Sequence, residues 1–206
     1  MKFKDDKDMI LLVVPISHTH YVMPPIGLGY LAAALRRGGF DEVVILDCVK
    51  EGLSFNGFRG FLERIKPRIV GFQIFSYDFD SVVKSIEIVK QLNHETKVLI
   101  GGAHVSATSA LALEEIKQAD YGFVGEGEIG LPMLAGRLLR DEQIPLENIP
   151  GLIWRENSSI RENARTGVED LDSLGFQPWD LMPPASYPDN PQGGFYKRFP
   201  IAPIST

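Results

Sequence analysis

Five short apolar segments alternate with stretches of helical periodicity, and this alternation restricts the fold more than any other feature of the chain. The segments are too short for helices, and the first is apolar on both faces, as a strand between two helix layers is. We expect strands at Met9–Val14, Glu42–Asp47, Arg68–Phe75, Lys97–Ile100 and Asp120–Val124. Strands that alternate with helices form a parallel sheet, because each helix carries the chain back to the edge where the previous strand began.

Each strand is followed by a segment whose apolar residues recur at helical spacing. We expect helices at Ile26–Arg37, Phe55–Lys66, Asp80–Leu92 and Ala107–Lys117, and a fifth that follows Glu128 and ends near Arg140. Right-handed crossovers then give an α/β, Rossmann-like (flavodoxin-like) fold with an open, parallel, five-stranded sheet. Counted along the chain, the expected strand order is 2-1-3-4-5, with the ligand-binding switch point between strands one and three.

The pattern changes after Arg140. Residues 148–156 and 159–163 have the sequence pattern of two short strands on either side of a polar turn, which predicts a β-hairpin. From Glu169 onward the chain is rich in proline and glycine without periodicity, as an extended linker is. The expected divisions are therefore a ligand-binding domain at 1–145, a hairpin appendage at 146–168 and a linker at 169–206.

Charge and cysteine content exclude several classes of function. A formal net charge of -6 argues against nucleic acid or an anionic membrane as the main partner. The single cysteine, Cys48, excludes an internal disulfide or a multi-cysteine metal site within this chain, and indicates a cytoplasmic protein. The charged N-terminus lacks a signal-peptide pattern, and the longest apolar run is shorter than a membrane span.

Ligands of such sheets bind at the carboxyl ends of the strands, so the loops that follow the strands hold the candidate residues. The clearest candidate is Gly101-Gly102 after the fourth strand, because two glycines let a flat ligand or a phosphate touch bare backbone. A tight turn into the next helix is the alternative interpretation. His104 is either a ligand contact or a buried, hydrogen-bonded histidine.

Two further loops have alternative interpretations. The long loop after the first strand contains His18 and His20, for which solvated side chains are the simplest interpretation. Its Gly27-Leu28-Gly29 resembles half of a dinucleotide fingerprint, but the loop is too long and proline-rich for a tight phosphate turn. In the segment Gly125–Glu128, a carboxylate between glycines suits hydrogen bonding to ribose or amide groups, whereas Glu128 could simply favour a helix N-terminus.

Several common enzyme motifs are missing from the sequence. There is no GxxxxGK[ST] phosphate-binding loop and no G-x-S-x-G nucleophile elbow. The first and third strands end in Val14-Pro15 and Phe75-Ser76 rather than in the acidic residues of a phosphoryl-accepting receiver domain. Phosphotransfer is therefore not expected.

Three segments together resemble the N-terminal cobalamin-binding domain of cobalamin-dependent radical SAM enzymes. They are Pro24–Ala33, Gly101–His104 and Asp120–Glu128, and the resemblance covers roughly residues 9–140. It implies that residues 1–145 are a cobalamin-binding, Rossmann-like domain. The implied cofactor contacts are Pro24, Pro25, Gly27, Gln73, Phe75, Ser76, Gly101, Gly102, His104, Gly125, Glu126 and Gly127.

The resemblance also indicates the state of the cofactor. In the methionine synthase type, the motif D-x-H-x-x-G supplies a histidine below cobalt; here its histidine position is Pro24, and its glycine is Gly27. Proline has no side-chain nitrogen to offer. The resemblance therefore implies base-off, His-off cobalamin, with the dimethylbenzimidazole tail buried in the sheet and no protein ligand to cobalt. A lower ligand from His18 or His20 is the alternative.

The expected function is that of a cobalamin-binding module of a radical SAM enzyme, with methyltransferase as the expected class. Residues 198–206 resemble the strand that leads into a radical SAM barrel, but the cluster-binding C-x-x-x-C-x-x-C loop of that family is absent. The resemblance thus implies a truncated chain, not catalytic alone, whose 4Fe-4S cluster and S-adenosylmethionine belong to a missing domain. The alternatives are a nucleotide-cofactor enzyme with the same fold and a non-catalytic interaction or signalling module.

Overall fold

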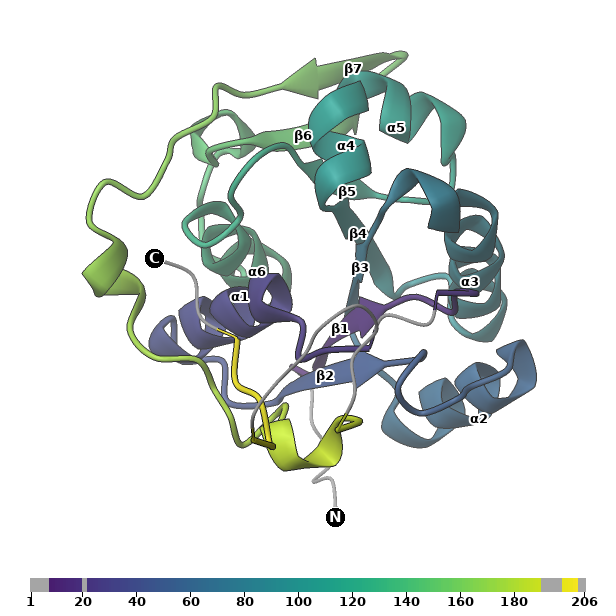
Figure 1. The fold of residues 1–206 in the computed structure, drawn as a ribbon. Coiled ribbons are helices and arrows are strands. Elements are labelled where there is room, and N and C mark those ends of the chain that lie inside the picture. Colours follow the sequence, from purple (N-terminus) through teal and green to yellow (C-terminus); the bar gives the residue numbers. More distant parts are fainter. Residues whose placement is uncertain (1–7, 20–21, 190–197, 204–206) are drawn as a thin grey trace.

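The computed structural model describes residues 8–19, 22–189 and 198–203, and its centre is one twisted sheet (Figure 1). The sheet has the order β2-β1-β3-β4-β5-β6-β7. The first five strands are parallel: β1 (Ile10–Val14), β2 (Val43–Asp47), β3 (Ile69–Gln73), β4 (Lys97–Gly101) and β5 (Tyr121–Phe123). The predicted α/β class and the order of these five strands are confirmed.

The expected count of five strands is wrong, because the hairpin extends the sheet. Strand β6 (Leu152–Glu156) pairs antiparallel with β5, and β7 (Ser159–Glu162) pairs with β6. Leu152 and Ile153 are fully buried. An unpaired parallel edge would expose a row of backbone hydrogen-bonding groups, and the hairpin covers that edge with apolar residues.

Six α-helices cover the sheet: α1 (Ile26–Arg37), α2 (Phe55–Ile65), α3 (Phe79–Leu92), α4 (Ala103–Thr108), α5 (Ala110–Glu115) and α6 (Gly130–Arg140), counted over the described residues. Short 3-10 turns lie at Ser76–Asp78, Leu146–Asn148, Leu171–Leu174 and Pro184–Ser186. The single helix expected at Ala107–Lys117 is wrong. Gly102 turns directly into α4, and Ser109, at φ 53°, separates α4 from α5.

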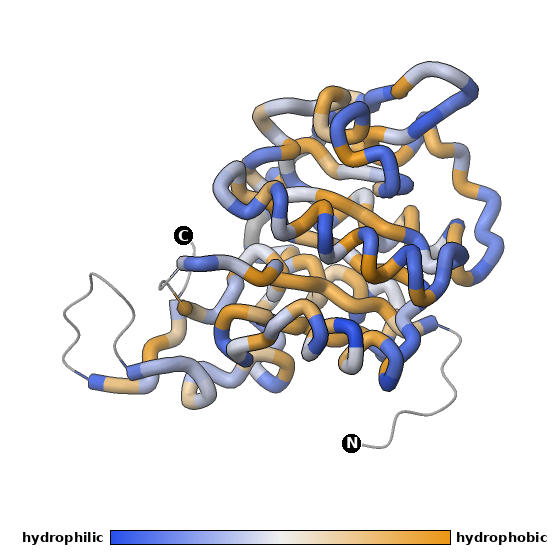
Figure 2. Tube along the Cα trace, turned by 90° about the vertical axis from the view of Figure 1, so that its right-hand side faces the viewer, coloured by the Kyte–Doolittle hydropathy of each residue, from blue (hydrophilic) through white to orange (hydrophobic). Residues whose placement is uncertain are grey.

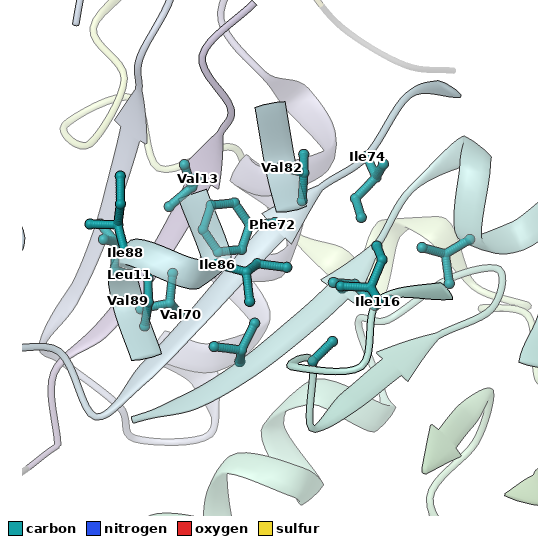
Figure 3. Close-up of a cluster of buried hydrophobic side chains, with 14 of the residues drawn as sticks. Leu11, Val13, Val70, Phe72, Ile74, Val82, Ile86, Ile88, Val89 and Ile116 are labelled. Carbon is teal, nitrogen blue, oxygen red and sulfur yellow. The ribbon is translucent and has the colours of Figure 1, made fainter. Parts of the chain in front are cut away.

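The helices form two layers, one on each face of the sheet (Figure 1). Helices α1 and α6 pack on the face that carries Leu12 and Leu99, whereas α2, α3, α4 and α5 pack on the opposite face. In Figure 3 the ring of Phe72 lies among aliphatic side chains of that opposite face, including Val70 and Ile86. Figure 2 shows largely hydrophobic stretches inside the molecule and helices on which hydrophobic and hydrophilic residues alternate. Burial of alternate residues on both faces is what a sheet between two helix layers requires.

The segment expected to be a linker lies along α1, and we call residues 169–189 the C-terminal strap. Arg36 of α1 donates hydrogen bonds of 2.9 and 2.7 Å to the carboxylate of Asp180. Gln177 lies so close to Gly29 that a Cβ added there would overlap its side-chain amide. The strap is therefore packed on the α1 layer.

Among the described residues, no helix is long and apolar enough to cross a membrane.

Candidate functional site

A pocket of about 200 Å³ opens at the carboxyl ends of β3, β4 and β5, on the face that α1 and α6 cover. Its floor is apolar, with Leu12, Leu99 and Phe123 from the strands and Leu31 and Leu131 from the helices. Its rim consists of backbone and polar groups: Gly27, Gln73, Gly101, Gly102, Gly125, Glu126, Gly127 and Glu128. The arrangement suits a flat, largely apolar group with a few polar atoms.

Missing side chains on adjacent strands create this pocket. Gly71 of β3 is paired with Leu99, and Gln73 is paired with Gly101 of β4. Because side chains alternate between faces, Gly71 and Gly101 both stand on the face toward α1 and α6. A Cβ at Gly101 would have only the carbonyl oxygen of Phe123 within 4 Å, at 3.9 Å, so it would project into open space. Gly101 therefore leaves open space that a larger residue would fill, and Gly71 lines the same slot, where an added Cβ would lie 3.2 Å from Cδ2 of Leu12.

Gly102 has a different role from its neighbour. Its φ is 98°, and a Cβ would lie 3.0 Å from the carbonyl oxygen of Ile74. Gly101 accepts a hydrogen bond of 2.8 Å from the Ile74 backbone N–H, and the His104 N–H donates one of 3.1 Å to the Ile74 carbonyl. These two hydrogen bonds join the end of β4 to the residue that follows β3, and they fix this part of the pocket rim.

The structure brings together seven of the residues predicted from sequence, since Gly27, Gln73, Gly101, Gly102, Gly125, Glu126 and Gly127 all line the pocket. The other five do not line it. Pro25 is the N-cap of α1, and Pro24 lines a small neighbouring cavity with Tyr187. Phe75 and Ser76 lie on the β3 loop beyond the rim, where Phe75 stacks on Tyr77 with ring centroids 5.6 Å apart.

The described histidines do not line the pocket. The Nδ1 of His104 is 3.0 Å from the hydroxyl of Ser76, its ring packs against Phe79, and its Nε2 is buried without a partner among the described residues. His18 is exposed and lines a separate cavity with Asp78. His20 lies outside the described residues.

The two carboxyl groups at the rim differ in their partners. The Oε2 of Glu126 accepts a hydrogen bond of 2.9 Å from the Val168 N–H. The Oε2 of Glu128 is buried and has no partner in the part of the chain that the structure describes. Burial raises the pKa of the Glu128 carboxyl, and the nearby charge of Glu126 adds to this, although backbone N–H groups of Glu128 and Gly127 oppose it.

Sequence reasoning missed two features of this site. Gly71 is not among the contacts predicted from sequence, although a glycine inside a buried strand, between Val70 and Phe72, is a signal of close approach by another group. The sequence predicts for Glu128 only a favourable place at a helix N-terminus, but α6 begins at Gly130 with Ile129 as its N-cap, so Glu128 precedes the helix and lines the pocket.

We compared the chain with families of known proteins. The family model of the B12 binding domain matches residues 12–135, which include the floor and rim of the pocket. The chain belongs to the B12 binding domain family. Because B12 is cobalamin, this match confirms the predicted cobalamin-binding domain, and the glycine-walled slot fits a flat group of that cofactor.

Curated relatives of this B12 binding domain include methyltransferases. An uncharacterized methyltransferase of Pyrococcus horikoshii is 32% identical over 168 residues, 80% of this chain and 35% of the relative. The anaerobic magnesium-protoporphyrin IX monomethyl ester cyclase of Rubrivivax gelatinosus is 26% identical, over 76% of this chain and 30% of the relative. The chain thus spans about a third of the length of the curated relatives it matches.

Solved structures share the fold. The radical S-adenosylmethionine methyltransferase TsrM of Kitasatospora setae, with cobalamin and a [4Fe-4S] cluster bound, matches with a TM-score of 0.67 and 22% identity. That match covers 79% of this chain and 30% of TsrM. The cobalamin-dependent S-adenosylmethionine radical enzyme OxsB, with aqua-cobalamin bound, also gives a TM-score of 0.67, at 16% identity over 79% of this chain and 23% of OxsB. The domain is therefore similar to those of cobalamin-dependent radical SAM enzymes, as its sequence predicted.

Proposed function

We propose that the chain binds cobalamin in its base-off, His-off form and serves as the N-terminal module of a radical SAM methyltransferase. The observation that carries the proposal is the slot left by Gly71 and Gly101 at the carboxyl edge of the sheet in a B12 binding domain. Bound as methylcobalamin, the cofactor would supply a methyl group. The residues of this chain would hold it and orient it.

The size of the slot supports insertion of the tail rather than of the whole cofactor. An apolar cavity of ~150 Å³ accepts a benzene ring, whereas sites for drug-sized molecules measure ~300–1,000 Å³. At about 200 Å³, the pocket suits one flat ring system such as dimethylbenzimidazole. The corrin would then lie across the strand ends, within reach of the rim residue Gln73 and of the predicted contacts Phe75, Ser76 and His104.

The residue at the motif's histidine position supports the His-off form. Pro24 is buried beside α1 and has no side-chain nitrogen. The one histidine of that loop among the described residues, His18, is exposed and lines another cavity. The residue at position 24 could therefore not supply an imidazole ligand to the cobalt of a bound cofactor.

The length of the relatives supports the place of the module in a larger enzyme. This chain matches about a third of each curated relative, so the 4Fe-4S cluster and S-adenosylmethionine would be bound by the remainder of such a protein. The cytoplasmic location expected from the single cysteine is part of the proposal. Membership of a radical SAM enzyme is tested by reading the coding sequence beyond Thr206. We expect a C-x-x-x-C-x-x-C loop to be encoded there, and the absence of this loop would contradict the proposal.

Binding is tested by gel filtration of the purified chain with hydroxocobalamin. We expect the visible absorbance of the cofactor to elute with the protein, and colourless protein at micromolar cofactor would contradict the proposal. Gly101→Leu should fill the slot and weaken binding by about 100-fold or more. Gly60→Leu is the matched control, because Gly60 lies on α2 and a Cβ added there would meet no atom within 4 Å.

The state of the cofactor has its own test. The electron paramagnetic resonance spectrum of bound cob(II)alamin shows nitrogen splitting only when a nitrogen ligand is below cobalt. We expect no such splitting in this protein. A nitrogen-split spectrum that His18→Ala or His20→Ala abolishes would overturn the His-off assignment while leaving cobalamin binding intact.

A further inference from the structure

The carboxyl group of Glu128 is the unexplained polar group of the pocket. It lines the slot beside Gly127, and its Oε2 is buried without a partner among the described residues. The neighbouring Glu126 already accepts a hydrogen bond from Val168 at 2.9 Å. A buried polar atom without a partner is unfavourable and points to a ligand atom that completes it.

The dimethylbenzimidazole base of the cofactor has one nitrogen that could accept a hydrogen bond in such a slot. When the base of cobalamin leaves cobalt, the ring nitrogen that had bound the metal keeps a free lone pair. That nitrogen would enter a slot whose floor is made by Leu12, Leu31, Leu99 and Phe123, none of which has a side-chain donor. It therefore needs a hydrogen-bond donor from the wall.

We propose that Glu128 donates a hydrogen bond from its carboxyl group to the free ring nitrogen of the dimethylbenzimidazole base. This inference rests on the proposed cobalamin function and assigns a residue to recognition of the tail. One proton is shared between Oε2 and the ring nitrogen, and no covalent bond changes. Backbone N–H groups of Gly127 and Glu128 favour the charged form of the same carboxyl group and so lower its pKa.

The protonation of Glu128 agrees with this role. Burial and the charge of Glu126 raise its pKa, while Arg37 of α1 lowers it. Without the shared proton, a carboxylate and a nitrogen lone pair would face each other, and both are acceptors. Cobalamin affinity should therefore be highest below the raised pKa of Glu128 and fall as the pH rises through it.

Three cofactor forms separate the roles of the tail. Cobalamin carries the basic ring nitrogen, a p-cresolyl cobamide has the ribose and phosphate but no ring nitrogen, and cobinamide lacks the nucleotide. Their dissociation constants are measured by spectroscopic titration of the full 206-residue chain and of Glu128→Ala, Glu128→Gln and the control Glu115→Ala. Glu115 is an exposed carboxylate on α5, on the opposite face of the sheet.

Glu128→Ala should weaken cobalamin binding by about tenfold, the size of one hydrogen bond, with less than about a twofold change for the other two forms. Glu128→Gln should bind cobalamin within about threefold of the parent, because its amide also donates, and should lose the pH dependence. Thermal unfolding of each variant verifies that it is folded.

Two results would overturn the inference, and they are distinguishable. Equal losses for cobalamin and the cresolyl cobamide in a folded Glu128→Ala would assign Glu128 to the ribose or to the fold, with cobalamin binding by the parent chain still intact. Failure of the parent chain to bind any of the three forms would instead overturn the proposed function, and this inference with it.

Discussion

Both faces of the sheet carry a buried core, but they differ at the carboxyl ends of β3 and β4. On the face toward α2 and α3, Val70 and Phe72 of β3 are buried in a filled core (Figure 3). On the face toward α1 and α6, the same strand has Gly71, and its neighbour β4 ends in Gly101. The five residues of β3 thus build a packed core on one side and a binding slot on the other. The period of two along a strand lets one short segment meet both demands.

The greatest change should come from loss of packing on the filled face. Phe72→Ala should lower the free energy of unfolding by about 3–5 kcal/mol, because it removes a buried ring next to Phe58 and leaves a cavity. Urea denaturation followed by circular dichroism measures this loss. A change below about 1 kcal/mol would show that this face is not the packed one.

The next effect concerns the corner between the strands and the rim. Gly102→Ala should destabilise the fold by about 1–3 kcal/mol, because φ is 98° and the new Cβ would lie 3.0 Å from the backbone oxygen of Ile74. Gly27→Ala is the matched control, since a Cβ at Gly27 has no atom within 4 Å. Equal unfolding free energies for the two variants would contradict the strain argument.

A smaller effect is expected inside the slot, on ligand binding rather than on stability. Gly71→Ala places a methyl group 3.2 Å from Cδ2 of Leu12, which can move, so the unfolding free energy should change by less than about 1 kcal/mol. Cobalamin affinity should fall about tenfold, or about 1.4 kcal/mol, because the added methyl group takes space that the tail would occupy. Titration with cobalamin and cobinamide measures it, and an equal fall for both ligands would place Gly71 outside the tail's path.

The weakest effect is expected at the strap. Asp180→Ala removes an ion pair with Arg36 in which the arginine side chain is 33% exposed and the aspartate 64% exposed, so the free energy of unfolding should fall by less than about 1 kcal/mol. The loss should shrink further at high salt, since exposed pairs are screened. Urea denaturation at two salt concentrations measures it, and a salt-independent loss above about 2 kcal/mol would show that the strap stabilises α1 by another route.

Most of the first five strands and their order could be predicted from the sequence, because local periodicity and the handedness of crossovers carry that information. The helix Ile26–Arg37 agrees at both ends, where prolines precede it and Gly38 follows. The break at Ser109 could not be predicted. Its hydroxyl donates a hydrogen bond to Glu162 of β7, a residue that is distant in sequence. The same limit applies to the hairpin, whose pairing with β5 depends on an edge that exists only in the folded sheet.

The class of the fold, its strand order and most of the rim of the pocket follow from the order of residues alone, because periodicity, right-handed crossovers and the loops at the carboxyl ends of the strands are enough to place them. The packed molecule was needed to show that Gly71 opens the floor and that Glu128 faces the slot. The physical reason is that the pocket forms only where α1, β3, β4 and α6 meet. The same meeting of elements buries the Oε2 of Glu128, which has no partner among the described residues. No local stretch of the chain contains that junction.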